Sequence, residues 1–527
     1  MRILKTKNIA IFVAGLAACV CLAAYYALSY PCHILWQEQN QIFLNDSYWI
    51  ATYFDKPAWA GCLAGEWLTQ FYHNVIAGSI ILTLSIAWAT IAFASVLSQL
   101  LPKTATLLLS ILFAILMIGC SLSSSTPLSF FICVAGGLSL GKARMEIIIN
   151  RHKINLSSLM VILSYWAFGF GALLTALSMV LIAVRAVIRK SEAISSGLIS
   201  SILPIIFAVA TPAVLCRAYS LPYSKALLYP GIARPTSPQR DFENHLAIAE
   251  AFYRNDFGKV KELALGADSP DELTAFYYYL SCAVKDSLPE NLMKYPVKNL
   301  GTLTTINDKT PLAIINMMND LYFELGDMTY AERAAMMRNV FSPRNRNVRM
   351  VKRLAEINLV SGDTLAALKY LRILDHTLFH SDWSRRHMPG ESSQEVETEI
   401  SRRRIFSNHK DNIRLGDNCR NIILELLESN SGNSIALDYL LCTDLLLKDM
   451  DTFKMDYDTY CMEKGNPRYR DLYQQALMIY LAGTDASPED WEKYIVSPEQ
   501  MQLFQQYSNR RGDPAFKDTY WYYFDRQ

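Results

Sequence analysis

Residues Val75 to Leu97 read VIAGSIILTLSIAWATIAFASVL and contain no charged side chain. A helix needs about 20 consecutive apolar residues to cross a hydrocarbon core of ~30 Å. This run is long enough to cross and carries nothing that opposes burial in lipid. It therefore predicts a transmembrane helix, and with it an integral membrane protein.

Further apolar runs surround this one, at Ile9–Leu28, Ala105–Ser121, Leu128–Leu140, Leu156–Val184 and Leu198–Leu215. The first run follows three basic residues, but Tyr30 and Pro31 stand where a cleaved signal peptide needs small residues, so we expect an uncleaved anchor. The run from 156 to 184 is long for one helix and short for two, with Gly169 and Gly171 as a possible turn. We therefore expect a membrane domain over residues 1–217 with six or seven passes.

The side on which each loop lies follows from the distribution of basic residues. Arg2, Lys5 and Lys7 precede the first run, and basic residues accumulate on cytoplasmic loops, so the loop 31–74 is predicted to be outside. Six passes would leave the rest of the chain inside and seven would leave it outside. The charge pattern does not decide between the two.

The outer loop 31–74 is rich in aromatic residues, which favour the membrane interface because they join an apolar ring to a polar group. Its acidic residues Glu38 and Asp46 would lie within about 80° of each other on a continuous helix. Polytopic glycosyltransferases that use lipid-linked sugars keep a catalytic base or metal ligand in this position. Glu38 and Asp46 are thus our candidate catalytic residues, and the alternative is two solvated carboxylates.

Several other site types find little support. The net charge of +1 gives no reason to expect a nucleic acid partner, and the 11 cysteines form no CxxC pair of the kind that structural zinc sites use. Gly136 to Lys142 spell a phosphate-loop core, but the hydroxyl residue is missing and the glycines lie in an apolar run. His376 and His380 are four positions apart near Asp382, yet an ordinary surface pair explains them. We predict no metal site and no cofactor.

Residues 241–527 follow a predicted linker at 218–240 and show helical periodicity with short breaks. Helix, Gly-Asp turn and helix occur twice, with the glycines at 326 and 362 being 36 positions apart, close to the 34-residue tetratricopeptide period. Weaker copies surround Asn255-Asp256 and Lys448-Asp449. The predicted fold class is therefore all-α: a polytopic membrane domain followed by a tetratricopeptide-like α-solenoid, with an insertion near 385–410.

Particular stretches resemble a family of uncharacterised multi-pass membrane proteins known from Bacteroidota, labelled as a domain of unknown function. They lie in both halves of the chain: Glu38-Gln39, Pro57 to Gly61, Gln70-Phe71, Arg353 to Glu356, Lys369 to Leu371, Thr377 to Phe379, Asp382-Trp383 and Thr519 to Trp521. The membrane part is shorter here than expected of that family. The resemblance implies architecture and lineage, hence a multi-pass protein of the bacterial inner membrane, and no activity.

Two functions remain open. In the leading hypothesis the membrane domain anchors a helical-repeat scaffold whose groove holds a protein partner in the cell envelope. In the alternative, the chain is a polytopic transferase acting on a lipid-linked or envelope substrate, with Glu38 or Asp46 as base or metal ligand. Convergence of these two carboxylates on one cavity would favour the transferase.

Overall fold

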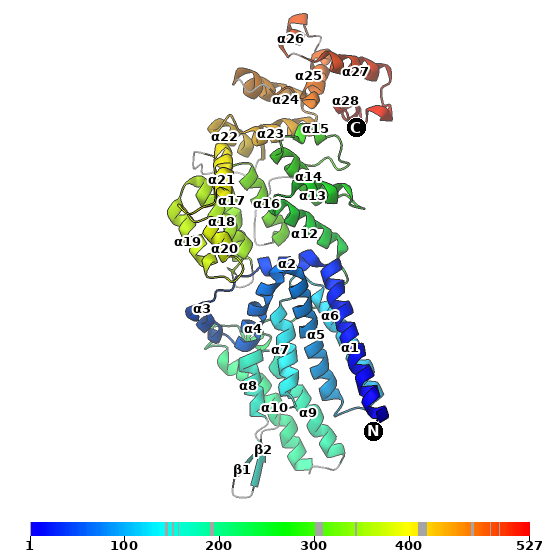
Figure 1. Ribbon diagram of the computed structural model, residues 1–527, viewed down its shortest axis with the longest axis vertical. Coiled ribbons are helices and arrows are strands. Elements are labelled where there is room, and N and C mark those ends of the chain that lie inside the picture. The colour runs from blue at the N-terminus through cyan, green and yellow to red at the C-terminus, as the bar shows by residue number, and fades with distance from the viewer. Residues whose placement is uncertain are drawn as a thin grey trace. The chain divides into compact units, whose positions relative to one another are not determined.

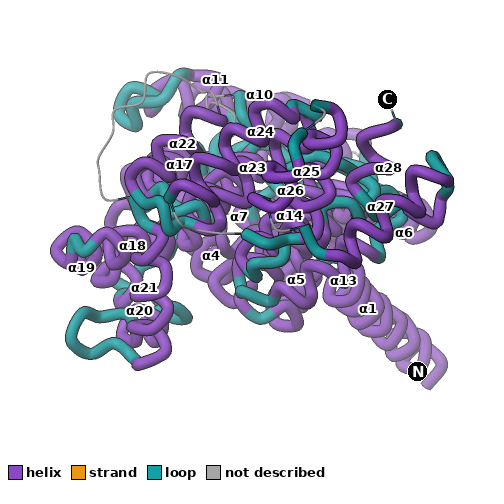
Figure 2. Tube along the Cα trace, turned by 90° about the horizontal axis from the view of Figure 1, so that it is seen from above, coloured by secondary structure: helices purple, strands orange, loops and turns teal. Residues whose placement is uncertain are grey.

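The computed structural model describes residues 2–142, 146–149, 152–155, 158–189, 194–300, 309–342, 345–408, 419–464, 468–484, 486–494 and 496–526. These residues form two compact units. The first unit contains residues 1–243 together with Arg346–Val348 and Ile373–Asp382, and the second contains the remainder. Helices and the loops between them make up almost all of the described chain (Figure 2).

The helices of the first unit are labelled in Figure 1. Their bounds are α1 Arg2–Ser29, α2 Pro31–Gln39, α3 Ser47–Ala51, η1 Thr52–Asp55, α4 Trp59–Thr69, η2 Gln70–His73, α5 Val75–Leu97, α6 Lys103–Ser121, α7 Leu128–Leu140, α8 Leu159–Phe168, α9 Gly171–Ile188, α10 Ile194–Leu215 and α11 Tyr223–Leu227. Two short strands, β1 (Glu146–Ile149) and β2 (His152–Asn155), pair as an antiparallel hairpin between α7 and α8. The prediction of an all-helical fold is therefore confirmed apart from this hairpin.

Helices α1 and α2 are separated by a sharp bend of 79° between their axes. The bend falls at Tyr30-Pro31, where α1 ends and Pro31 begins α2. Proline disfavours helical backbone in the residue before it, yet it suits the first position of a new helix because its missing N–H needs no partner there. The bend thus starts a separate helix that carries Glu38.

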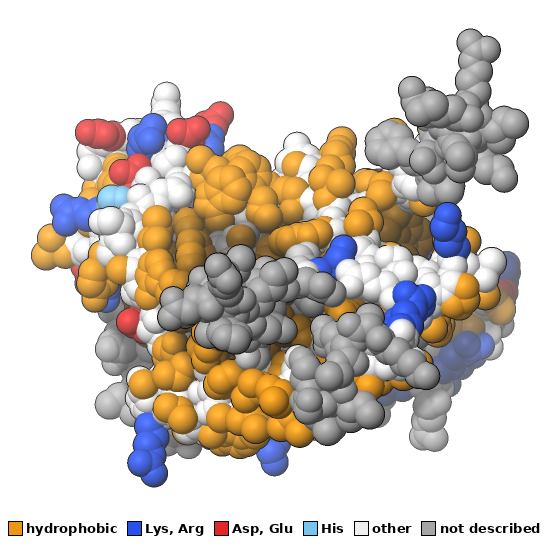
Figure 3. All heavy atoms as spheres, turned by 90° about the horizontal axis from the view of Figure 1, so that it is seen from below, with side chains coloured by type: hydrophobic (Ala, Val, Ile, Leu, Met, Phe, Trp, Pro, Cys, Tyr) orange, Lys and Arg blue, Asp and Glu red, His pale blue; other side chains and the backbone are white. Residues whose placement is uncertain are grey.

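Three helices among the described residues are long and apolar enough to cross a membrane: Val75–Leu97, Lys103–Ser121 and Gly171–Ile188. The count rises to four if the bent pair Val13–Ser29 and Pro31–Gln39 forms one span. The other passes expected from the sequence correspond to shorter apolar helices, at Leu128–Leu140, Leu159–Phe168 and Ile199–Leu215. Hydrophobic side chains cover much of the face drawn in Figure 3.

The long apolar run from 156 to 184 is broken into α8 and α9 at Gly169, whose φ is +55°. A side chain at this position would also collide with the backbone oxygen of Tyr229, only 2.1 Å from an added Cβ. Beside the break, the N–H of Ala58 donates to the carbonyl of Tyr165, and the N–H of Phe170 donates to the carbonyl of Tyr229. The turn between α8 and α9 therefore lies against Ala58, a residue of the predicted outer loop.

The second unit contains the helices that follow the start of α12. Their bounds are α12 Arg240–Tyr253, α13 Phe257–Leu265, α14 Glu272–Val284, α15 Leu288–Asn291, α16 Leu312–Glu324, α17 Met328–Val340, α18 Val348–Ser361, α19 Thr364–Asp375, α20 Ser381–Arg386, α21 Gln394–Phe406, α22 Cys419–Ser429, α23 Ser434–Leu447, α24 Met450–Tyr457, η4 Asp458–Glu463, α25 Asp471–Gly483, α26 Pro488–Lys493, α27 Pro498–Asn509, η5 Pro514–Phe516 and α28 Tyr520–Asp525. The first residue of α18, the last residues of α19 and the first residues of α20 belong to the two short segments that are assigned to the first unit.

One turn recurs in four helical hairpins of the second unit. In each, a residue with positive φ is followed by an aspartate: Asn255-Asp256, Gly326-Asp327, Gly362-Asp363 and Lys448-Asp449. The left-handed residue ends one helix, and the aspartate side chain accepts an N–H from the first turn of the next. The helix, turn and helix pattern predicted from the sequence is present at all four places.

Two segments are more closely packed than the sequence suggested. Residues 218–240, expected to be a linker, belong to the first unit, where the N–H of Thr236 donates to the carbonyl of Gly119 at 3.0 Å. The stretch near 385–410, expected to be a surface insertion, is described as far as residue 408 and forms α21. Its buried Arg403 makes an ion pair with Glu324, and its last residues pack on the turn at Gly326.

A buried charge cluster lies in the core of the second unit. The carboxylate of Asp320 is fully buried and accepts hydrogen bonds from Arg349 at 2.9 Å, Arg353 at 3.0 Å and the hydroxyl of Tyr277 at 3.1 Å. The guanidinium group of Arg349 also lies over the ring of Tyr253. We refer to Asp320, Arg349, Arg353 and Tyr277 as the Asp320 cluster.

Candidate functional site

Glu38 is the penultimate residue of α2, and its side chain is turned into the first unit. Only 6% of the residue is exposed, although a carboxylate buried without a partner would be costly. After Gln39 the helix ends, and residues 41–46 have no regular structure. The end of α2 is therefore the point at which a charged side chain meets the irregular part of the outer loop.

Two short segments from much later in the chain complete this part of the first unit. The N–H of Val348 donates to the carbonyl of Gln41 at 3.2 Å, and Asn347 donates to the side-chain oxygen of Asn40 at 3.2 Å. The N–H of Asn45 donates to the carbonyl of His376 at 3.0 Å. These bonds hold residues 346–348 and 373–382 against residues 40–45.

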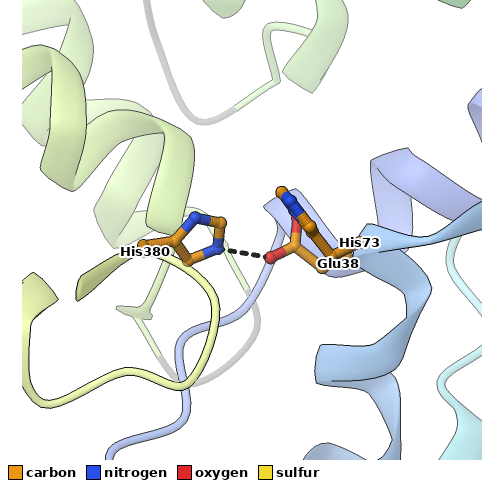
Figure 4. A group of neighbouring side chains, drawn as sticks. All are labelled: Glu38, His73 and His380. Atoms are coloured by element: carbon orange, nitrogen blue, oxygen red, sulfur yellow. Dashed lines mark hydrogen bonds and ion pairs between the residues drawn. The ribbon is translucent and has the colours of Figure 1, made fainter. Parts of the chain in front are cut away.

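His380 is the residue that these contacts bring to Glu38. Its Nε2 lies 2.7 Å from Oε1 of Glu38, across 342 positions of sequence, and both side chains are buried. Figure 4 shows the ring and the carboxylate pointing toward each other. The other ring nitrogen, Nδ1, is buried and has no hydrogen-bond partner among the described residues.

His73, the last residue of η2, is the third member of the group. Its ring stacks on Phe379 with centroids 5.5 Å apart, and meets the ring of His380 edge to face at 5.3 Å. One ligand atom from each of Glu38, His73 and His380 lies within 4.8 Å of the others. Unlike its two neighbours, His73 is exposed, so the group has a side open to solvent or to the membrane interface.

A small hollow adjoins the pair. Its lining residues are Glu38, Gln41, Ile42, Phe43, Gln70, Val348, Thr377, Phe379 and His380. The free volume of about 10 Å³ is room for roughly one water-sized group. The site can therefore hold a water molecule or an ion beside Glu38, and a larger molecule would have to approach from outside.

Glu243 fixes the other end of α2. Its carboxylate accepts the backbone N–H groups of Cys32 and His33, at 2.6 and 3.0 Å, which α2 itself cannot satisfy in its first turn. Burial raises the pKa of Glu243 to about 7, because removal from water penalises the charged form more than the two hydrogen bonds favour it. Glu243 is thus a positioning residue for the helix that carries Glu38.

The two candidate residues from the sequence do not converge. Asp46 is exposed, stands at the start of α3 and makes no capping hydrogen bond with its side chain. The expected alignment of Glu38 and Asp46 assumed one continuous helix, whereas α2 ends at Gln39 and α3 begins at Ser47. Glu38 faces the hollow, and Asp46 is not part of the group around it.

The histidines are also grouped differently from what the sequence indicated. His376 and His380 were paired by their four-residue spacing, but the chain turns between α19 and α20 and only His380 is buried. The spacing of residues in the sequence indicates no partner for His73. Only a long-range contact between residues 38, 73 and 380 could have revealed this group, and a single sequence carries no such information.

The arrangement supports two kinds of chemistry. A carboxylate hydrogen-bonded to an imidazole can accept or deliver a proton at a bound group. A carboxylate with two imidazoles is also a ligand set that transition metals use. Both need the same three residues in the positions seen in Figure 4.

Comparisons with known proteins give one match. A family model described as "Family of unknown function (DUF6057)" matches residues 5–527. No curated protein and no solved structure matches the chain.

Proposed function

The chain belongs to the DUF6057 family, a family of unknown function, and we propose that it is a polytopic membrane transferase with its reactive site at Glu38. Because Asp46 does not converge on the hollow with Glu38, the proposal rests on Glu38 alone, and the single observation that carries it is the burial of Glu38 beside the hollow, hydrogen-bonded to His380. Buried ionisable groups in a concave site are where acid-base chemistry is usually found.

The substrate class follows from the position of the site. Tyr48, Phe54 and Trp67 are exposed aromatic residues of the same outer loop, and such rings favour the membrane interface. A lipid-linked or envelope substrate would therefore present its polar group at this level. Glu38 takes the proton of an acceptor hydroxyl, the hydroxyl oxygen bonds to the transferred group, and the lipid-linked leaving group departs with the bonding electron pair.

The proposed topology has seven passes. Figure 1 shows the N-terminal end of α1 and the β1–β2 hairpin at one end of the first unit, and α2 at the other. Because the turn at Gly169 contacts Ala58 of the outer loop, α8 and α9 are best assigned as an outward and a returning pass. Seven passes leave the residues after α10 on the outer side, in a bacterial inner membrane.

A second argument supports the same topology. His380 pairs with Glu38, so residues 373–382 lie on the side of the membrane that carries the outer loop. Helix α18 lies before these residues in the chain and contains Arg349, Lys352 and Arg353. These charges exclude α18 as a further membrane span. Reporter fusions after Lys190 and after Gln527 test this. Seven passes predict a cytoplasmic reporter at the first site and an external reporter at the second.

The transferase is tested with two matched amide variants. Glu38→Gln removes the proposed base while keeping shape, and Asp46→Asn makes the same chemical change on the exposed residue. In the native host, we expect Glu38→Gln to cause accumulation of a lipid-linked precursor and Asp46→Asn to leave the pool unchanged. A normal pool in a stably folded Glu38→Gln strain would exclude this function.

The helical-repeat scaffold is the second candidate. We propose that the hairpins of the second unit stack as a tetratricopeptide-like solenoid and hold a protein partner. The supporting observation is a set of apolar side chains left exposed on helices of the second unit, including Leu365 of α19 at 80% and Leu447 of α23 at 72%. A partner would cover such residues.

Charge substitutions test the scaffold without shortening the chain. Deleting the second unit would also disturb the segment that carries His380, so Leu365→Asp and Leu447→Asp are made in the full-length protein. We expect loss of co-purifying partners at an unchanged melting temperature, with Gln502→Asp on the exposed face of α27 as the control. If both leucine variants retain every partner, the scaffold proposal fails.

A further inference from the structure

We propose that Glu38, His73 and His380 bind a divalent transition-metal ion, with Zn²⁺ as the best-matched ion. One carboxylate and two imidazoles provide three protein ligands, the number found in catalytic zinc sites that keep a fourth position open. The three residues come from α2, η2 and the segment before α20, so the ion would link three separate parts of the first unit.

The spacing of the ligand atoms suits an ion after a small adjustment. Bonds of about 2.0–2.1 Å at a tetrahedral centre place neighbouring ligand atoms roughly 3.3–3.4 Å apart. Nε2 of His380 and Oε1 of Glu38 are 2.7 Å apart, joined by a direct hydrogen bond, and all three ligand atoms lie within 4.8 Å of one another. Separating the bonded pair by about 0.6 Å would admit the ion.

The hollow supplies an independent observation. It is lined by Glu38 and His380 but not by His73, so its free volume of about 10 Å³ suits a water beside the ion, in the position that the three ligands leave open. Gln41, Gln70 and Thr377, which also line the hollow, carry polar side chains.

The surroundings also indicate how tightly the ion is held. Binding through Nε2 places the ring proton of His380 on Nδ1, which has no acceptor within the described part of the chain. Most zinc-binding imidazoles donate that proton to a second group, which strengthens the bond to the metal. His73 is exposed and offers a path for entry. We therefore expect an exchangeable ion, bound more weakly than in a structural zinc site.

The metal site does not depend on the transferase reaction. With the ion bound, Glu38 becomes a ligand, and a water on the ion would take over the acid-base role. Metal binding measured in the absence of any substrate separates the two proposals. A normal precursor pool in the Glu38→Gln strain would contradict the transferase proposal and leave the metal-site proposal intact. Absence of metal binding would contradict the metal-site proposal and leave the transferase proposal intact.

The direct test is Zn²⁺ titration of the detergent-solubilised full-length protein after chelator treatment, followed by calorimetry and by metal analysis. We expect one Zn²⁺ per chain. Because changes to second-sphere partners cost about 10–100-fold in affinity, His73→Ala and His380→Ala are expected to cost at least about 100-fold. His376→Ala, which removes an exposed imidazole four positions from His380, is the control and should bind like the wild type.

A second measurement needs no variant. Co²⁺ bound by one carboxylate, two imidazoles and a water in a tetrahedral site has intense visible absorption, and Zn²⁺ should abolish this absorption at one equivalent. The proposal is overturned if wild-type protein shows no such spectrum, if folded His73→Ala and His380→Ala bind Zn²⁺ as the wild type does, or if His376→Ala loses as much affinity as they do.

Discussion

The two units bury charged groups in different ways. In the second unit, both oxygens of Asp320 are occupied by Arg349, Arg353 and Tyr277. In the first unit, Glu38 has one short bond to His380, a nitrogen of that ring is unpaired within the described chain, and a hollow lies next to both. Both oxygens of Asp320 are thus occupied, although the Nε atoms of Arg349 and Arg353 are buried without a partner in the described chain, whereas Glu38 has room beside it to bind something else.

Removing the carboxylate of Asp320 should have the largest effect on stability. Asp320→Ala leaves two buried guanidinium groups without their shared counter-ion, and breaking a buried ion pair in this way costs about 3–5 kcal/mol. Hydrogen exchange in α14, α16 and α18 of the full-length protein measures the loss locally. Protection unchanged from the wild type would remove the distinction between the two clusters.

The repeated turns give the next largest effect. Gly326 and Gly362 both have φ of +84°, but an added Cβ at 326 would lie 1.9 Å from the backbone oxygen of Phe406, while at 362 it meets no described atom within 4 Å. Left-handed backbone costs an alanine about 1–2 kcal/mol, and overpacking adds about 1–3 kcal/mol. We expect Gly326→Ala to cost about 3–4 kcal/mol and Gly362→Ala about 1–2 kcal/mol.

Melting temperatures of the two alanine variants check this prediction, each compared with the wild type in the same detergent. Equal losses would mean that α21 does not pack on the turn at 326. The packing of Phe406 on Gly326 would then be looser than the 1.9 Å approach indicates.

The pH dependence of Glu243 tests how the first unit positions its site. Its pKa rises from 4.5 in the unfolded chain to about 7 in the folded one. Between these values the folded protein keeps a proton that the unfolded chain has lost, so stability falls as pH rises from 4.5 to 7 and stays lower above 7. The total loss of stability across this pH range is about 3 kcal/mol.

Glu243→Gln is always neutral and can still accept one of the two N–H groups. We expect the melting temperature of the wild type, relative to this variant, to decrease between pH 5 and pH 8. The exposed Glu489 provides a control substitution, Glu489→Gln, which should follow the wild type. A difference that does not change with pH would mean that Glu243 titrates normally.

The smallest effect is expected at the site itself. Glu38→Gln replaces a charged hydrogen bond to His380 with a neutral one, and hydrogen bonds contribute about 0.5–1.5 kcal/mol net. The melting temperature should fall by only a few degrees while the chemistry at the site is lost. If Glu38→Gln destabilises the protein as much as Asp320→Ala does, Glu38 is a structural group and the comparison fails.

Local sequence patterns predicted much of this fold. The apolar run from 75 to 97 forms one helix with those bounds, and the aspartates after the left-handed residues at 326 and 362 begin α17 and α19 as expected. Both depend on neighbours within a few positions, where helical periodicity and capping act.

The site could not be predicted in the same way. Glu38 was identified together with Asp46 from their spacing on an assumed helix of the outer loop, but its partners come from residues 73 and 380. Long-range contacts of this kind leave no trace in spacing or composition. The end of α2 at Gln39 similarly separates Glu38 from Asp46, and nothing in the seven residues between them signals a helix break as plainly as Pro31 does.

The pairing of Glu38 with His380 also sets an order of events during synthesis. The two residues are 342 positions apart, and ribosomes add about 5–20 residues per second, so Glu38 is made roughly 17–70 s before its partner. Throughout that interval the carboxylate lacks His380, and of the two imidazoles in the group only that of His73 is already made. The protein therefore completes the group of Glu38, His73 and His380 only after the apolar helices, the outer loop and most of the hairpins up to α19 have left the ribosome.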